Sequence, residues 1–248
     1  MEEAKAFNRI ESFDIFSSNK LKEILGSERM TYVYLKKWIE EGKIVKLPFF
    51  FYSLIDKNTG KYKANLYELA CRVEEGAFLV LVSAGKIHGI NLPETDTIYV
   101  STNKRFALKE FDGWYFKPRI LPDSFGIVKK NSIRYTDYTR TVVDIIREFD
   151  KYMSLNEFLE FLDSVKELNF KKIKEILKAY DSNILFQKVG WLNEEGLISV
   201  DNPVELSEFC ISRIGKSHRF FCKDAKKGGI HIARWQLMVP EELMKQVR

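Results

Sequence analysis

The chain has 248 residues, of which 45% are hydrophobic and 30% are charged, so it can bury a substantial core and form more than one compact unit. A net charge of +5 is compatible with nucleic-acid binding but does not require it. The three cysteines lack paired spacing, the charged N-terminus is unlike a secretion signal, and no apolar run is long enough to span a membrane. We therefore expect a cytoplasmic protein without disulfides and without a membrane partner.

The first predicted elements lie in residues 17–54. Ser18 or Asn19 can cap a short helix that Gly26 ends. A second helix starts at Ser27 and stops at Gly42, with an inward stripe formed by Thr31, Leu35, Trp38 and Ile39. In residues 43–46 polar and apolar side chains alternate, which predicts a strand. Pro48 supplies a bend, and residues 49–54 are predicted to return as a second strand. This order predicts a winged helix-turn-helix, for which double-stranded DNA is the first partner to test.

In such a domain the start of the second helix enters the major groove. Ser27, Arg29 and Tyr32 are the candidates for contacts at base edges, and Arg29 leads because arginine to guanine is the commonest specific contact. Phosphate contacts are expected from Lys36, Lys37, Lys43 and Lys46. The alternative is that these lysines form an ordinary solvated face, that Glu28 repels phosphate, and that the helix pair mediates protein contact.

A polar stretch at residues 55–64 predicts the domain boundary, because it contains turn-forming residues and its apolar residues follow neither helical nor strand spacing. We expect a winged helix-turn-helix in residues 1–57 and a larger α+β domain in residues 65–248. The first domain is nearly neutral. An excess of roughly five positive charges lies in residues 101–140, and roughly six lie in residues 213–234.

The predicted elements of the larger domain mix helices and strands. Helices are expected at residues 66–74 and 139–152, and two more at 155–180. Strands are expected at residues 77–82, 97–101, 114–116, 126–129 and 132–135. The order indicates an α+β fold with a mainly antiparallel or mixed sheet.

Several motifs along the chain resemble one family. They are the turn Glu40-Glu41-Gly42, the pair Ser83-Ala84 followed by His88-Gly89-Ile90, residues 136–144 with Arg140-Thr141-Val142-Val143-Asp144, and residues 187–196. Together they resemble the AbiEi antitoxins, transcriptional regulators of type IV toxin-antitoxin systems. Two positions depart from that pattern: Thr139 replaces an acidic residue, and Pro48-Phe49-Phe50 replaces the arginine and glycine often seen in the wing.

The resemblance implies a non-enzymatic antitoxin and autorepressor without a cofactor. The first domain would bind inverted repeats in its own promoter. The second would counteract a nucleotidyltransferase toxin without a stable complex between the two proteins. The alternatives are a plain transcription factor or protein-interaction module without a toxin, and a nucleic-acid-processing enzyme that uses the winged helix for targeting.

The residues of the family motif also have a structural interpretation. Arg140 and Asp144 lie four apart on a helix and can form a surface or half-buried ion pair, with Thr141 helping to start the helix. Asp137 or Thr139 can cap that helix. His88 is expected to be a hydrogen-bonded turn residue, since no nucleophile lies at a recognisable spacing. We expect Ser83 and Gly89, like His88, to have structural roles.

The C-terminal tail combines basic and aromatic residues. Basic side chains interleaved with Phe220, Phe221 and Trp235 suit a second nucleic-acid surface, whose candidates are Lys216, Arg219, Lys223, Lys226 and Lys227. The alternative is a strand hairpin around Gly228-Gly229 with its aromatics inward. The spacings of Cys210, His218, Cys222 and His231 match no known zinc site, so we expect no metal.

Overall fold

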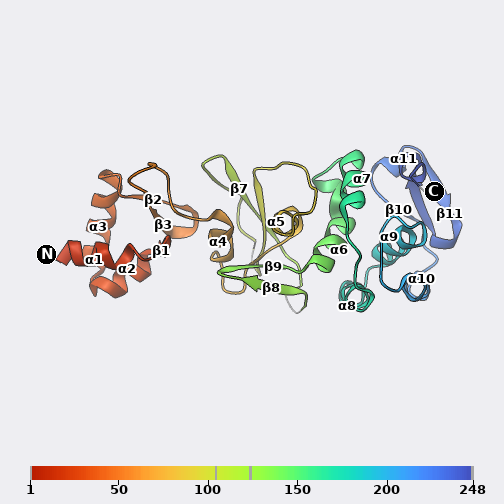
Figure 1. The fold of residues 1–248 in the computed structure, drawn as a ribbon, viewed down its shortest axis with the longest axis horizontal. Coiled ribbons are helices and arrows are strands. Elements are labelled where there is room, and N and C mark those ends of the chain that lie inside the picture. Colours follow the sequence, from red (N-terminus) through yellow and green to blue (C-terminus); the bar gives the residue numbers. More distant parts are fainter. Residues whose placement is uncertain (1, 104, 123–124, 247–248) are drawn as a thin grey trace.

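The computed structural model describes residues 2–103, 105–122 and 125–246. Its fold is α+β, and three consecutive parts follow one another along the long axis, with the two termini at opposite ends (Figure 1). A winged helix comes first, a six-stranded mixed sheet follows, and a group of helices carrying a small second sheet completes the chain.

The N-terminal part has the complete element order of a winged helix-turn-helix. Its elements are α1 (Glu2–Ile10), β1 (Ile15–Ser17), α2 (Ser18–Leu25), α3 (Glu28–Glu40), β2 (Ile44–Lys46) and β3 (Phe51–Leu54). The strands form an antiparallel sheet in the order β1-β3-β2. The predicted helix-turn-helix with a strand pair is therefore confirmed, and β1 and α1 complete it.

Local caps set the limits of α2 and α3. The N-cap of α2 is Ser17, whose hydroxyl accepts from the amide of Lys20, so Ser18 and Asn19 were the wrong candidates by one or two residues. Gly26, at φ 66°, ends α2, and Ser27 caps α3 as predicted. The buried stripe of α3 consists of Thr31, Tyr34, Leu35 and Trp38. Ile39 is 40% exposed, because a step of about 100° turns it away from Trp38.

The wing is docked on the mixed sheet. The turn Pro48–Phe50 is a 3-10 helix, so β3 begins at Phe51 and not at the predicted residue 49. The Phe49 ring makes edge-to-face contacts with Phe106 and Phe116, at centroid distances of 5.0 and 5.6 Å. Leu47 belongs to the same core cluster. The neighbouring ring of Phe50 is 76% exposed.

Residues 55–64 form an ordered turn that is tied to both neighbours. The carboxylate of Asp56 accepts from the amides of Asn58 and Thr59, and Ile55 bridges to Tyr62. On one side the amide of Ala64 donates to the Ser53 hydroxyl of β3. On the other side Tyr62 donates to the Asp112 carboxylate, 2.9 Å away. This segment therefore holds the winged helix and the sheet together.

The mixed sheet has the order β6-β7-β5-β4-β9-β8. Its strands are β4 (Phe78–Leu79), β5 (Thr97–Ser101), β6 (Lys109–Phe111), β7 (Trp114–Arg119), β8 (Ile127–Lys130) and β9 (Ile133–Thr136), and the preceding helix is α4 (Leu66–Cys71). The prediction of one strand over residues 77–82 was wrong, because α5 (Leu81–Ile87) takes over after β4. A uniformly apolar run fits a buried helix as well as a buried strand.

The last part packs helices against a small sheet. The helices are α6 (Tyr138–Glu148), α7 (Leu155–Ser164), α8 (Phe170–Tyr180), α9 (Asn183–Glu194), α10 (Pro203–Ile211) and α11 (Glu241–Met244). The strands β10 (Arg219–Phe220), β11 (Gly229–Ile232) and β12 (Leu237–Pro240) have the order β10-β12-β11. The predicted turn at Gly228-Gly229 was misplaced: β11 and β12 are joined by residues 233–236. Over the described ranges, no helix has the length and apolarity needed to cross a membrane.

The docked wing gives the first prediction. Phe49→Ala removes a ring from the cluster with Phe106 and Phe116, and we expect it to lower the free energy of unfolding by about 3 kcal/mol. Phe50→Ala is the matched control, because it removes an exposed ring with a similar backbone φ of 64°, and its effect should stay within about 0.5 kcal/mol. Equal effects of the two substitutions in urea unfolding would show that the wing is not docked through Phe49.

Candidate nucleic-acid interface

Helix α3 presents one continuous face to solvent. Arg29 lies three residues before Tyr32 and four before Val33, Lys36 lies four and three residues after them, and Glu40 follows Lys36 by four; all five are exposed. Tyr32 is 71% exposed and Val33 is 44% exposed, and the two lie side by side on this face. The structure thus brings the predicted Arg29, Tyr32 and Lys36 onto one surface, together with Val33, which the sequence analysis did not single out.

Ser27 lies at the edge of this face and has a structural role. Its hydroxyl accepts from the amide of Met30, and its carbonyl accepts from the Thr31 hydroxyl. The neighbouring Glu28 pairs with Lys22 of α2 at 2.8 Å. That pair offsets the negative charge expected to repel phosphate at the helix tip.

Lys37 and Lys43 lie on the side of α3 that faces α1. The ammonium of Lys37 is 2.7 Å from the Glu3 carboxylate, and Glu3 also accepts from the Trp38 indole. The hydrogen bond from Lys37 holds the pKa of Glu3 below its ordinary value. Lys43 pairs with Glu41 at 2.7 Å. Both lysines therefore have acidic partners within the domain, whereas the nearest carboxylate of Lys36, on Glu40, is 3.9 Å away.

The wing exposes few side chains, because part of it packs on the mixed sheet. Lys46 at the end of β2 is exposed, and so is Phe50. Phe49 is held by the mixed sheet, and the carbonyl of Ile15 on β1 accepts from the Arg72 guanidinium. The orientation of α3 relative to the rest of the molecule is therefore set by contacts at β1 and at the turn between β2 and β3.

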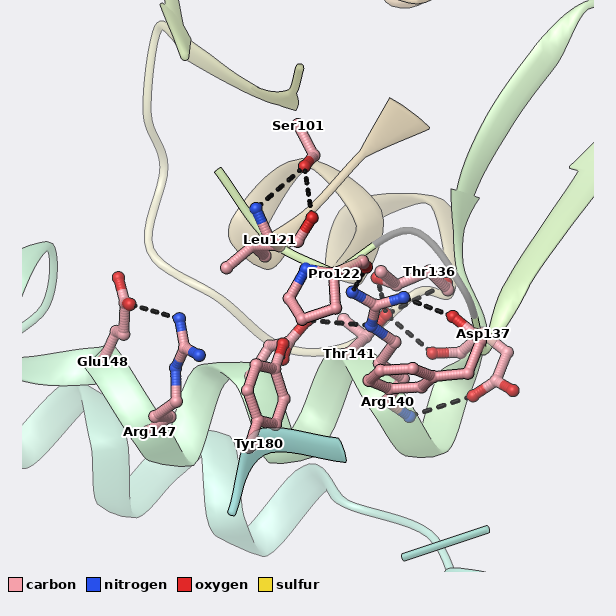
Figure 2. A network of polar contacts seen from close by, with 12 residues as sticks. Ser101, Leu121, Pro122, Thr136, Asp137, Arg140, Thr141, Arg147, Glu148 and Tyr180 are labelled. Carbon is pink, nitrogen blue, oxygen red and sulfur yellow. Dashed lines mark hydrogen bonds and ion pairs between the residues drawn. The ribbon is translucent and has the colours of Figure 1, made fainter. Parts of the chain in front are cut away.

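The family-motif residues form a buried network (Figure 2). The Arg140 side chain is fully buried, donates to the carbonyls of Pro122 and Phe125, and lies 4.3 Å from the Phe125 ring centre. Its ion pair with Asp144, at 3.6 Å, confirms the predicted partner, but the pair is fully buried and not on the surface. Tyr180 of α8 donates to Asp144.

The remaining motif residues join β9, α5 and α6. Asp137 caps α6, as one of the two predicted candidates, by accepting from the Arg140 amide at 2.9 Å. The Thr141 hydroxyl lies 3.0 Å from the Thr136 carbonyl, and the imidazole Nε2 of His88 lies 2.8 Å from the same carbonyl oxygen. The Ser83 hydroxyl accepts from the Tyr99 amide.

Gly89, at φ 69°, turns the chain after α5. Residues 83–89 and 136–144 thus make structural contacts that join β9, α5 and α6, and these contacts agree with the predicted cap and turn roles.

Two buried charged groups have shifted pKa values. Burial raises the pKa of Asp144 to about 6, against the opposing effects of Arg140 and Tyr180. Burial also lowers the pKa of Lys188 on α9 to about 8. Its ammonium lies 3.4 Å from the carbonyls of Ile146 and Arg147 near the end of α6, which it helps to satisfy. Lys188 lies in the middle of α9, where residues 185–193 are all buried, and its burial was not foreseen.

The predicted second basic surface lies at the far end of the molecule from α3 (Figure 1). Its five candidates, Lys216, Arg219, Lys223, Lys226 and Lys227, are all exposed. Of the three aromatics in this tail, Phe221 and Trp235 are fully buried and Phe220 remains 45% exposed. His218 and His231 lie together, but the described residues contain no group of three side chains suited to a metal ion.

Comparison with known proteins gives a fold but no family. No protein-family model matches the chain, and no curated protein matches it. Among solved structures it is similar to the crystal structure of the RV2827C protein from Mycobacterium tuberculosis, with a TM-score of 0.63 and 13% sequence identity. The similarity covers 91% of this chain and 86% of the other. The two proteins therefore share a fold over most of their lengths.

The buried Asp144 predicts a pH effect. Because its pKa rises from 3.8 to about 6 on folding, the folded state binds more protons between those values, and the contribution of Asp144 to stability increases as the pH falls from about 6 to 4. Measured against Asp144→Asn, which cannot titrate, wild-type unfolding free energy should rise over this interval. Asp163→Asn, at an exposed carboxylate on α7, should leave the profile unchanged. A difference between wild type and Asp144→Asn that stays constant with pH would contradict the assignment.

Proposed function

We propose that the chain is a non-enzymatic, sequence-specific repressor that binds double-stranded DNA at its own promoter. The observation that carries the proposal is the exposed face of α3 within a complete winged helix-turn-helix. In this class of domain the second helix lies in the major groove, with its N-terminal residues at base edges. Such a protein acts where the DNA is, so a cytoplasmic location is part of the proposal.

Each side chain of this face has a contact that suits its chemistry. Arg29, in the first turn of α3, can donate two hydrogen bonds to guanine, and the Val33 side chain can contact a thymine methyl group. Lys36, one turn further on, suits a phosphate. Tyr32 offers a ring and a hydroxyl between them. The face therefore combines groups that read bases with groups that hold the backbone.

The docked wing limits what one copy can read. With Phe49 held by the sheet, base contacts come from a single helix, which covers few base pairs. Two copies on an inverted repeat, with half-sites about one helical turn apart, double these contacts. We therefore propose an inverted repeat as the operator.

The antitoxin role rests on the resemblance to the AbiEi family. On that basis we propose that the part of the chain after the winged helix counteracts a nucleotidyltransferase toxin without a stable complex between the two proteins. The exposed face of α3 has no part in this second activity. Repression and neutralisation should therefore be separable by mutation.

Loss of Arg29 should weaken DNA binding and reduce its sequence preference. In binding assays with DNA from upstream of the gene, Arg29→Ala should weaken affinity for the preferred site by about 10- to 100-fold and reduce the preference over random DNA. Lys36→Ala should instead weaken binding to all sequences and lower the salt slope by about 1. Lys178→Ala, an exposed lysine on α8, removes the same charge and should change neither. Equal binding of wild type and Arg29→Ala to specific and random DNA would refute the repressor.

Separate activities give a second test. Arg29→Ala should abolish repression of a reporter driven by the chain's own promoter and still protect cells that express a nucleotidyltransferase encoded next to its gene. The repression readout tests the DNA-binding proposal, and the protection readout tests the antitoxin proposal. Failure of the wild-type chain to protect would refute the antitoxin role and leave the repressor intact.

A further inference from the structure

The solvent face of the C-terminal sheet carries a row of three side chains from three strands. In the register of the sheet, Phe220 of β10 and His231 of β11 both pair with Met238 of the central strand β12. Paired residues of neighbouring strands point to the same side. The adjacent row contains Leu237, which is fully buried and belongs to the core with the helices. Phe220, Met238 and His231 therefore share the face that points away from the core.

Two flat groups are available on this face. The Phe220 ring is 45% exposed, and the Lys226 ammonium lies 5.9 Å from its centre. His218 and His231 are both exposed, with their ring nitrogens 2.8 Å apart and their ring centres 4.6 Å apart. A phenyl ring and a pair of imidazoles in one row offer successive stacking surfaces.

The surroundings of the row are strongly basic. Residues 213–234 carry an excess of roughly six positive charges, with Asp224 as the acidic residue among them. Asp224 lies 3.9 Å from Lys227, and Lys223 donates to a backbone carbonyl of Asp150. Lys216 and Arg219 make no ion pair with any described residue. Arg234 pairs with Glu194 at 2.8 Å, so a polyanion would find Lys216 and Arg219 as cations that it can pair with without displacing an ion pair.

Buried aromatic residues support the sheet that carries the row Phe220, Met238 and His231. Trp235 is fully buried, packs where Gly190 leaves space on α9, and donates to the Glu194 carboxylate. Phe221, next to the exposed Phe220, packs against Trp191 at a centroid distance of 5.5 Å. The exposed ring is thus held on a rigid support, which lowers the entropy cost of binding.

We propose that this row binds single-stranded nucleic acid, with bases stacked on Phe220 and the histidine pair and phosphates held by the surrounding lysines and arginines. A duplex keeps its bases stacked on one another, so its phosphates can contact the lysines and arginines but its bases cannot stack on Phe220. Single strands can use both. The surface is separate from α3 and does not depend on the repressor proposal.

The test uses the full chain with labelled 15-nucleotide single strands of RNA and DNA and with a duplex of unrelated sequence. Because α3 is proposed to bind duplex DNA, the duplex is used to compare variants: Phe220→Ala should leave duplex binding unchanged. Phe220→Ala should weaken single-strand binding about tenfold, and Phe220→Trp should preserve it. Phe50→Ala removes another exposed ring, in the wing of the N-terminal part, and should have no effect. Arg29→Ala should also leave single-strand binding unchanged, which separates this site from α3.

Three results would overturn the proposal. A loss of duplex binding in Phe220→Ala as large as the loss of single-strand binding would indicate a surface that extends the duplex footprint. Equal single-strand affinity of wild type and Phe220→Ala, with loss in Lys216→Ala and Lys226→Ala, would indicate a purely electrostatic surface that also suits an acidic protein. Absence of single-strand binding at low salt would overturn it directly. Circular dichroism of each variant confirms that the comparisons are made between folded proteins.

Discussion

Phe49 packs against Phe106 and Phe116, and this aromatic contact fixes the wing against the mixed sheet. The remaining geometry of the N-terminal part depends on it. Because β2 and β3 cannot swing freely, α3 is presented at a constant angle, with Arg29, Tyr32 and Val33 facing solvent. The positive φ of Phe49, 61°, is uncommon for a large residue, and the following Phe50 shares it with a φ of 64°.

A second constraint joins the sheet to the helices behind it. The Arg140 guanidinium is fully buried, donates to two backbone carbonyls and lies beside an aromatic ring and the Asp144 carboxylate, while its Nε has no hydrogen-bond partner among the described residues. Removing one partner of such a pair leaves an uncompensated buried charge, which is more costly than the pair itself is favourable. The residues that most resemble an AbiEi motif therefore hold the joint between β9 and α6. Chemistry and recognition must come from exposed residues elsewhere.

How much the sequence predicts differs between elements for physical reasons. The limits of α3 follow from Ser27 and Gly42, because caps are local, and strand β5 follows from its composition. The helix in residues 81–87 was missed because it begins inside the apolar run 77–82. A run without polar residues shows neither the helical nor the strand spacing of apolar residues. The contact of Phe49 with Phe116 joins residues far apart in the chain, so no local pattern reveals it. The candidate site divides in the same way: exposure of Arg29 follows from helical spacing, whereas the pairing of Lys37 with Glu3 requires the packing of α1.

The central claim is that α3 reads the major groove of an inverted repeat while the wing stays docked. Methylation protection on DNA from upstream of the gene tests it most directly, because guanine N7 lies in the major groove. The account predicts two clusters of protected guanines about one helical turn apart, symmetric about the centre of a repeat, and their loss in Arg29→Ala. A footprint without protected guanine N7 atoms, or one that Arg29→Ala leaves intact, would contradict it.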